Sequence, residues 1–179
     1  HSIARRQRQM CIRDSHIRAW IVHAKSVGMV TSIVSNGTGV DREFLEAMSE
    51  HLDWFGLSID ASNDILHAQL GRGRKGEIKQ GVSGHLRRTL PVADLLHEFG
   101  VGVKLNTVVT DLNKDDDMSQ IVRRIRPHRW KIFQALRIDG ENEEDIGELE
   151  VADRAFETYV ERHQHCLLYT SDAADEQWS

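Results

Sequence analysis

The sequence predicts an α/β fold with about four parallel strands and helices that cross over between them. Short apolar segments alternate along the chain with longer segments whose apolar residues recur every three or four positions. No linker, proline-rich stretch or internal repeat interrupts this alternation. Strands joined by helices at such spacing run parallel with right-handed crossovers, either in an open doubly wound sheet or in part of a barrel.

The expected elements follow one another in regular order. In the first half they are a helix at 16–28, a strand at 31–35, a helix at 41–50, a strand at 54–59 and a helix at 63–70. In the second half they are a helix that ends at Gly100, a strand at 101–109, a helix at 116–125, a strand at 130–135 and a helix at 153–163. Asp41 suits a helix N-cap, and Gly28 suits a helix stop. The strands are too few to close a barrel by themselves.

The two ends of the sequence differ from the rest. One nucleotide string translates to residues 1–15, and its reverse complement, read in one frame, translates to 166–179 without a mismatch. The string resembles the transposase adaptor of shotgun sequencing libraries. We therefore expect 1–15 and 166–179 to be adaptor-derived, and 16–165 to be natural sequence cut on both sides by the read. Both cysteines, Cys11 and Cys166, then belong to adaptor, so no disulfide or metal-thiolate argument rests on them.

The charge balance is mildly acidic. The chain has a net charge of −5, and because the charges of the two end segments cancel, 16–165 keeps that value. Such a surface argues against nonspecific binding to nucleic acid, and no apolar run is long enough to span a membrane. We expect one cytoplasmic domain of about 150 residues with neither nucleic acid nor a membrane as partner.

Polar residues accompany every expected strand, and ligands collect at the carboxyl ends of parallel strands. The residues assigned to these ends are Ser35, Asn36 and Gly37, then Ser58 and Asp60, then Lys104 with Asn106, and finally Arg129 with Lys131 and Gln134. Taken alone, Asn36 and Asp60 are better explained as turn formers or helix caps. Lys104 and Lys131 lie within otherwise apolar strands. Together with Arg129 they predict an anionic ligand such as a phosphate chain.

Three other features carry less weight. The glycines of 71–76 superficially resemble a phosphate-cradling loop, but the run lacks the Gly-Lys-Ser/Thr ending and follows a helix instead of a strand. His163 and His165 are close in sequence, which by itself does not make a metal site. The acidic run 115–117 is typical of a solvated helix start.

An ordered set of short strings runs through the chain. They are Ser32-Ile-Val-Ser-Asn-Gly37, Leu70-Gly-Arg-Gly73, Val103-Lys-Leu-Asn-Thr-Val108, Asp117-Met118, Arg129-Trp-Lys-Ile-Phe-Gln134 and Ile138-Asp-Gly-Glu-Asn142. In this order and with these separations they resemble the viperin family of radical S-adenosylmethionine (radical SAM) enzymes. The late helix, with Glu161-Arg-His163, continues the match, which covers 31–165 and is strongest toward the prokaryotic members.

The resemblance implies a fold and an activity. The fold is a partial (βα)6 TIM-like radical SAM barrel, and the cofactors are S-adenosylmethionine and a 4Fe-4S cluster. Reductive cleavage of S-adenosylmethionine, with electrons from a flavodoxin- or ferredoxin-type donor, yields a 5′-deoxyadenosyl radical that removes the 4′ hydrogen of a ribonucleoside triphosphate. Loss of water then gives the 3′-deoxy-3′,4′-didehydro nucleotide, a chain terminator in antiviral or antiphage defence.

The resemblance also assigns roles to residues of this chain. Ser58 and Arg72 match the family positions that hold S-adenosylmethionine, and Asn36 lies on the strand end beside them. The positions that hold the nucleoside triphosphate are Lys104, Asn106, Arg129 and Lys131.

The departures from the family pattern concern the chemistry itself. The family's CxxxCxxC cluster loop, its Gly-Gly-Glu-Pro motif and its C-terminal substrate-covering segment are absent from this sequence. Without three thiolates no cluster assembles. We therefore expect no catalytic residue, no metal ligand and no bound cofactor in this fragment, which should be inactive and should expose an apolar sheet edge.

Two alternatives remain at this point. A noncatalytic nucleotide-binding module with a doubly wound sheet would explain the lysines and the missing cysteines, but not the ordered strings. Another radical SAM enzyme, acting on a peptide or a cofactor precursor, would share the barrel and the S-adenosylmethionine positions. It would have no need for Lys104, Arg129 and Lys131 together.

Overall fold

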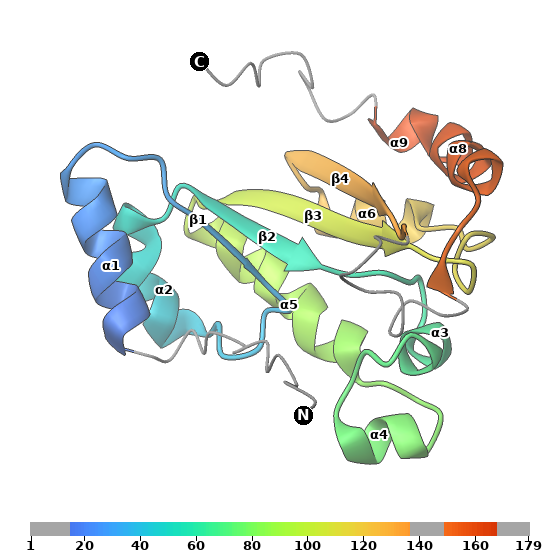
Figure 1. The fold of residues 1–179 in the computed structure, drawn as a ribbon. Coiled ribbons are helices and arrows are strands. Elements are labelled where there is room, and N and C mark those ends of the chain that lie inside the picture. Colours follow the sequence, from blue (N-terminus) through green and yellow to red (C-terminus); the bar gives the residue numbers. More distant parts are fainter. Residues whose placement is uncertain (1–14, 137–148, 168–179) are drawn as a thin grey trace, which may run out of the picture.

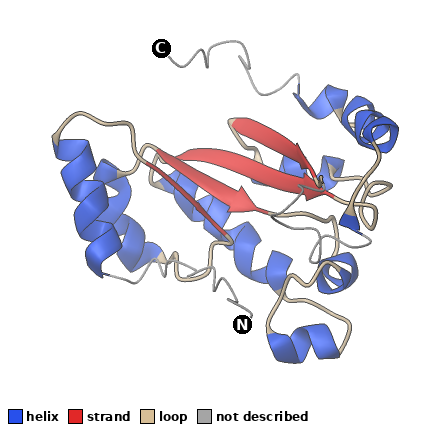
Figure 2. Cartoon of the chain, in the orientation of Figure 1, coloured by secondary structure: helices blue, strands red, loops and turns tan. Residues whose placement is uncertain are grey.

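Four parallel strands form the centre of the protein, seen here in a computed structural model that describes residues 15–136 and 149–167. The strands are β1 (Ser32–Ser35), β2 (Trp54–Ser58), β3 (Gly102–Val109) and β4 (Arg129–Gln134). They pair in the order β1-β2-β3-β4, and Figure 2 shows that their arrows point the same way. The prediction of about four parallel strands is confirmed.

Helices join successive strands, as predicted. Before β2 come α1 (Ser15–Ser26), α2 (Arg42–Met48) and the short 3₁₀ helix η1 (Ser49–His51). Between β2 and β3 lie α3 (Asp64–Gln69), α4 (Lys75–Lys79) and α5 (His85–Glu98). After β3 follow α6 (Ser119–Ile125), α8 (Asp153–Arg162) and α9 (Gln164–Leu167). Figure 1 shows α5 running along the sheet next to β2 and β3, which it contacts.

The strand order separates the two architectures that the sequence left open. A doubly wound sheet reverses its strand order at a switch point and carries helices on both faces. Here each strand adds beside its predecessor, and α2, α5 and α6 share one buried cluster with a single face of the sheet. This is the arrangement of a barrel segment, and it leaves the other face of the sheet without a helix layer among the described residues.

The core lies between that helix layer and the sheet. In β3 buried residues alternate with less buried ones, so Val103 and Leu105 face the helices, and their register partners Phe55 and Leu57 of β2 are fully buried on the same face. The helices contribute a matching apolar stripe, namely Phe44, Leu45, Met48, Val92, Ala93, Leu96, Ile121, Val122 and Ile125. Within the described part of the chain, no helix combines the length and the apolar character that crossing a membrane needs.

The helix caps explain where the elements begin. Asp41 caps α2 as predicted, because its carboxylate accepts a hydrogen bond from the Phe44 amide at 2.9 Å. The predicted start of a helix at Asp116 is wrong, since α6 begins at Ser119. The Asp116 carboxylate instead accepts bonds of 2.6 Å from the amide and the hydroxyl of Ser62. It therefore ties two loops together rather than starting a helix in solvent.

The glycine-rich run holds more structure than predicted. Gly71 and Gly73 have positive φ angles of 71° and 156°, but α4 already begins at Lys75. The Arg74 amide donates to the Glu77 carboxylate at 3.0 Å and so closes the first turn. The string 138–142 and most of the two predicted adaptor segments lie outside the described residues.

Candidate functional site

Two faces of the sheet follow from strand geometry. Side chains alternate between the faces along each strand, so Lys104 and Asn106 point away from the helix layer that covers Val103 and Leu105. A Cβ atom on Gly56 would lie 3.0 Å from Asn106 Nδ2 and 3.1 Å from Val34 Cγ2. Gly56 therefore sits between these side chains on the face without helices, which we call the open face.

The register of the strands brings five of the seven predicted site residues onto the open face. One row across the sheet consists of Gly56, Lys104 and Arg129, which are successive Cα partners. The next row consists of Ser58, Asn106 and Lys131. Neighbouring strands lie roughly 4.8 Å apart, so members of a row are direct neighbours.

The predicted position of these residues along the strands needs a correction. Lys104 and Arg129 were assigned to carboxyl ends, but Arg129 is the first residue of β4, and Lys104 lies in the amino-terminal half of β3. Ser58 does end β2. The candidate site thus extends along the open face toward the amino ends of the strands, instead of lying only at their carboxyl ends. Sequence alone missed this because β4 enters the sheet opposite the third residue of β3.

One buried polar atom of Asn106, on the open face, has no hydrogen-bond partner among the described residues. Its Oδ1 atom is buried and accepts no hydrogen bond among the residues that the structure describes. A buried carbonyl without a donor is costly, and such atoms in folded proteins usually meet a partner, a water or a ligand. Because its Oδ1 has no donor among the described residues, and Gly56 beside its Nδ2 has no side chain that could supply one, Asn106 is suited to receive a donor group of a bound molecule.

Arg72 reaches the same sheet from the loop after α3. Its Nε atom lies 2.6 Å from Oδ2 of Asp60, whose side chain is 5% exposed. The other carboxylate oxygen of Asp60 accepts a 2.8 Å bond from the Val108 amide. Asp60 therefore anchors Arg72 at the carboxyl edge of β2 and β3, close to Ser58 in the chain. Sequence reasoning had treated Asp60 as a turn former or cap.

Asn36 is engaged in a turn. Its side-chain oxygen accepts a 3.0 Å bond from the Thr38 amide, around Gly37 with a φ of +78°. Its main-chain carbonyl accepts a 3.1 Å bond from the Thr89 hydroxyl of α5. These contacts fit the turn-forming role that was the better explanation for Asn36 alone, although it does stand at the carboxyl end of β1.

Two buried histidines that the sequence did not single out support Ser58. His85 Nε2 donates to the Ser58 carbonyl at 2.9 Å, and the His67 ring packs 4.8 Å from the His85 ring. Burial lowers the pKa of His85, and burial together with His85 lowers the pKa of His67 to about 4. Both rings are therefore neutral near pH 7. Helical position gave no signal for them, since a histidine on an apolar face looks like ordinary core.

Trp54 lies on the open face, and sequence reasoning also passed over it. Its ring centroid lies 4.7 Å from Lys104 Nζ and 5.3 Å from Arg129 Cζ, so both cations stack on one indole. The available signal was positional, because Trp54 shares the strand parity of Gly56 and Ser58.

The residues of this chain do not fit a 4Fe-4S cluster. The sequence has two cysteines, Cys11 and Cys166, and a cluster of this kind takes at least three thiolates. Within the described ranges, no group of three or more histidine, cysteine or acidic side chains is placed to hold a metal ion. His163 bonds through both ring nitrogens, to the Met118 amide and to the Tyr159 carbonyl.

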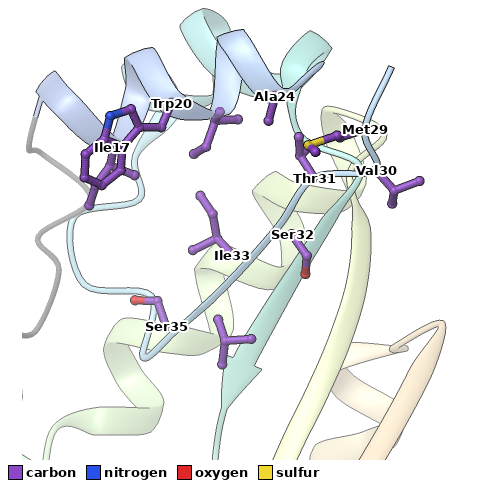
Figure 3. A pocket seen from close by; sticks show the side chains of 11 residues that line it. Ile17, Trp20, Ala24, Met29, Val30, Thr31, Ser32, Ile33 and Ser35 are labelled. Carbon is purple, nitrogen blue, oxygen red and sulfur yellow. The ribbon is translucent and has the colours of Figure 1, made fainter. Parts of the chain in front are cut away.

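A cavity of about 380 Å³ lies elsewhere, between α1 and β1. Figure 3 shows Trp20 and Ala24 of α1 across it from Ile33 and Ser35 of β1. Two of its lining residues, Val30 and Val34, are 76% and 62% exposed. β1 is thus an apolar edge of the described sheet, as predicted. The cavity borders the first open-face row at Val34, the register partner of Gly56, but none of the seven predicted site residues lines it.

Comparison with known proteins gives the family. No family model matches the chain. It is 37% identical over 145 residues to an S-adenosylmethionine-dependent nucleotide dehydratase of Flammeovirga pacifica, covering 80% of this chain and 48% of the relative. It is 33% identical to a nucleotide dehydratase of the same name from Thermoplasmatales archaeon strain ISO4-H5, covering 81% of this chain and 50% of the relative. It is 34% identical to one from Oncorhynchus mykiss, covering 79% of this chain and 41% of the relative. The chain is a viperin-like sequence.

Solved structures agree on the fold of this viperin-like chain. A domain of pyruvate-formate lyase-activating enzyme from Bacteroides vulgatus matches with a TM-score of 0.58 at 7% identity, covering 84% of this chain and 85% of the other. The structure of anSMEcpe with bound AdoMet and Cp18Cys peptide matches with a TM-score of 0.55 at 17% identity, covering 76% and 36%. The predicted part of a radical SAM barrel is confirmed. The viperin-like chain spans half or less of the curated relatives named above.

Proposed function

We propose that this chain is the part of a radical SAM nucleotide dehydratase that holds a ribonucleoside triphosphate inside the barrel. The intact parent converts that substrate to its 3′-deoxy-3′,4′-didehydro analogue and acts in the cytoplasm in antiviral or antiphage defence. The names of the relatives support the reaction class. One observation carries the assignment to this chain, namely that Lys104, Arg129 and Lys131 share the open face with the buried, unmet oxygen of Asn106.

The chemistry of the open face matches a polyphosphate. Three cationic side chains from two neighbouring strands neutralise phosphate oxygens better than one, and Arg129 presents a planar fork of donors. Asn106 would accept a hydrogen bond from a donor group of the same ligand. In this proposal these residues bind and orient the substrate but transfer no proton or electron.

The carboxyl edge of β2 is the place that we propose for S-adenosylmethionine, with Ser58, Arg72 and Asn36. Ser58 and Arg72 offer hydrogen-bond donors there, and Asp60 and His85 hold them in place. Bound in the intact parent, the cofactor supplies the radical chemistry. The cluster cysteines, the electron donor of flavodoxin or ferredoxin type and the covering segment belong to the parent in this proposal, with 16–165 as its share of the chain.

Nucleotide binding by the chain itself tests the proposal. Isothermal titration with ATP, CTP, GTP, UTP and inorganic tripolyphosphate at constant ionic strength should detect binding of the polyphosphate part. Lys131→Gln should weaken that binding about tenfold, since a hydrogen bond to a charged group is lost. Lys79→Gln, which removes the same charge from exposed α4, is the matched control and should leave the affinity unchanged.

Several results would contradict this assignment. If Lys131→Gln and Lys79→Gln weakened nucleotide binding equally, the effect would reflect the net charge of the chain and not a specific site. If Lys131→Gln kept full affinity, the ligand would bind elsewhere. Thermal unfolding of each variant, followed by circular dichroism, shows that the folded state is being compared. A preference for one of the four triphosphates would name the substrate of the parent.

A further inference from the structure

Trp54 occupies an unusual place at the start of β2. Its indole lies against the backbone of β3 at Gly102, where an added Cβ atom would stand 2.5 Å from Trp54 Cε3 and 2.8 Å from the Asp53 carbonyl. Only a glycine allows this contact, because no flexible side-chain end is available to move away. The chain thus combines a tryptophan and a glycine on neighbouring strands at Cα positions that are register partners.

The ring is held from a second side. His128 meets Trp54 edge to face with ring centroids 6.1 Å apart, and His128 Nδ1 accepts a 3.0 Å bond from the Val103 amide. His97 of α5 packs 5.6 Å from His128 and bonds to the Ile125 carbonyl at 2.8 Å. The indole is therefore fixed by the sheet backbone and by the helix layer, not only by its own rotamer.

This fixed ring carries the two cations of the first open-face row. Lys104 and Arg129 are direct cross-strand partners, and like charges in such positions repel each other. Both nevertheless stack on the Trp54 ring, at 4.7 Å and 5.3 Å from its centroid. The negative face of the indole attracts each cation and so offsets their repulsion. It also limits the rotamers of two long side chains.

We propose that Trp54 is a positioning residue for the polyphosphate site, acting through Lys104 and Arg129. This rests on the proposed function, because the two cations matter here as binders of an anionic ligand. Trp54 itself touches no substrate in this assignment. It arranges the charge before the ligand arrives, so that binding does not have to order the two side chains.

The test is a set of double-mutant cycles with inorganic tripolyphosphate as the probe. Trp54→Leu in the full chain should weaken binding about tenfold, and Trp54→Phe, which keeps a weaker aromatic face, should recover much of the loss. In a Lys104→Gln background, Trp54→Leu should cost clearly less, since one of its two partners is gone. In a Lys131→Gln background it should keep its full effect, because Lys131 lies in the other row. Trp20→Leu, a change at an exposed tryptophan of α1, is the control.

Each outcome decides something. Equal effects of Trp54→Leu in the Lys104→Gln and Lys131→Gln backgrounds would overturn the positioning role, as would unchanged affinity in Trp54→Leu. A purely structural role predicts that Trp54→Phe and Trp54→Leu weaken binding only in proportion to lost thermal stability. If Trp54→Leu does not fold, the comparison of Trp54→Phe with the unaltered chain in the two backgrounds decides instead. Absence of any tripolyphosphate binding by the unaltered chain would remove the proposed function and this inference together.

Discussion

The two faces of the β-sheet differ in almost every property although they share the same strands. The helix-covered face carries Phe55, Leu57, Val103 and Leu105, all fully buried. At the alternate positions the open face carries glycine, serine, asparagine and three cations, together with Trp54 and Val108. One set of backbone hydrogen bonds thus supports a packed core on one side and a polar row on the other. We expect the covered face to set stability, and the open face is the one that we propose binds the ligand.

The largest expected effect is a cavity on the covered face. Leu105→Ala should lower the free energy of unfolding by about 2 to 5 kcal/mol, because Leu105 is fully buried between β3 and the helices. Val108→Ala, on the open face of the same strand and only half-buried, should cost less than about 1.5 kcal/mol. Urea unfolding followed by circular dichroism compares them. Equal losses in the free energy of unfolding for the two variants would show that the two faces contribute equally to stability.

Acid should weaken the fold through the buried histidines behind the site. The pKa of His67 is lowered to about 4, first by burial and then by His85, with Asp60 and Asp64 acting in the opposite direction. The unfolded chain therefore takes up protons first, and stability should fall as the pH drops from about 6.5 to about 4, by about 3 kcal/mol for His67 alone. Urea unfolding across this range measures it.

His67→Asn should flatten that pH dependence, because its amide can still donate to the Asn63 carbonyl that His67 Nδ1 now bonds. His23→Asn, at an exposed position of α1, should leave the profile unchanged. Asp53 and Asp94, whose pKa values are lowered from 3.8, lose their contribution below this window, and Glu77, whose pKa is lowered from 4.5 to about 2, begins to lose its contribution only at the acid end of it. A profile that His67→Asn leaves as steep as before would show that other groups carry the effect.

A methyl group at Gly102 should disturb the open face at its amino end. Gly102→Ala places a Cβ against Trp54 and the Asp53 carbonyl, so we expect a loss of about 1 to 3 kcal/mol in stability. Tripolyphosphate binding should weaken with it if Trp54 arranges the cations. Gly76→Ala in α4 meets no atom within 4 Å and should stabilise the protein slightly. Thermal unfolding and calorimetric titration separate the two effects.

The smallest effect should come from ion pairs on the outer surface of the helix layer. Glu98→Gln breaks the 2.7 Å ion pair between Glu98 and Arg42, and both side chains are about half exposed. We therefore expect the free energy of unfolding to fall by no more than about 0.5 kcal/mol. Glu46→Gln, an exposed change on α2, is the comparison. Urea unfolding at low and high salt would reveal a larger, salt-sensitive loss, which would mean that charge also stabilises the covered face.

Much of the fold could be read from periodicity. Each predicted strand and helix is present, and Asp41 caps α2 as expected, because these features depend on residues near one another in sequence. Asp116 was misjudged for the opposite reason, because a serine 54 positions away binds its carboxylate. Lys75 was misjudged although its contact is local: the glycine-rich composition predicted a loop, but the Glu77 carboxylate closes a helical turn at the Arg74 amide.

The candidate site divides in the same way. Residue type and family resemblance selected Lys104, Asn106, Arg129 and Lys131, and strand parity placed them on one face. Their positions along the strands relative to one another could not be predicted, because the register of each strand pair is set by contacts across the sheet. Trp54, His67 and His85 were missed because each looks like ordinary core in its own segment. The roles of the seven predicted residues in binding remain predictions.

By itself the sequence determined the alternation of strands and helices, the resemblance to viperin and the lack of enough cysteines for a cluster. These follow from composition and from the order of residues along the chain. Only the tertiary structure decided that the strands add in sequential order, that two rows of site residues cross three strands, and that one indole carries two cations. Those features depend on contacts between residues that are far apart in the chain. Several arrangements are compatible with the local sequence, and packing and strand register determine which of them forms.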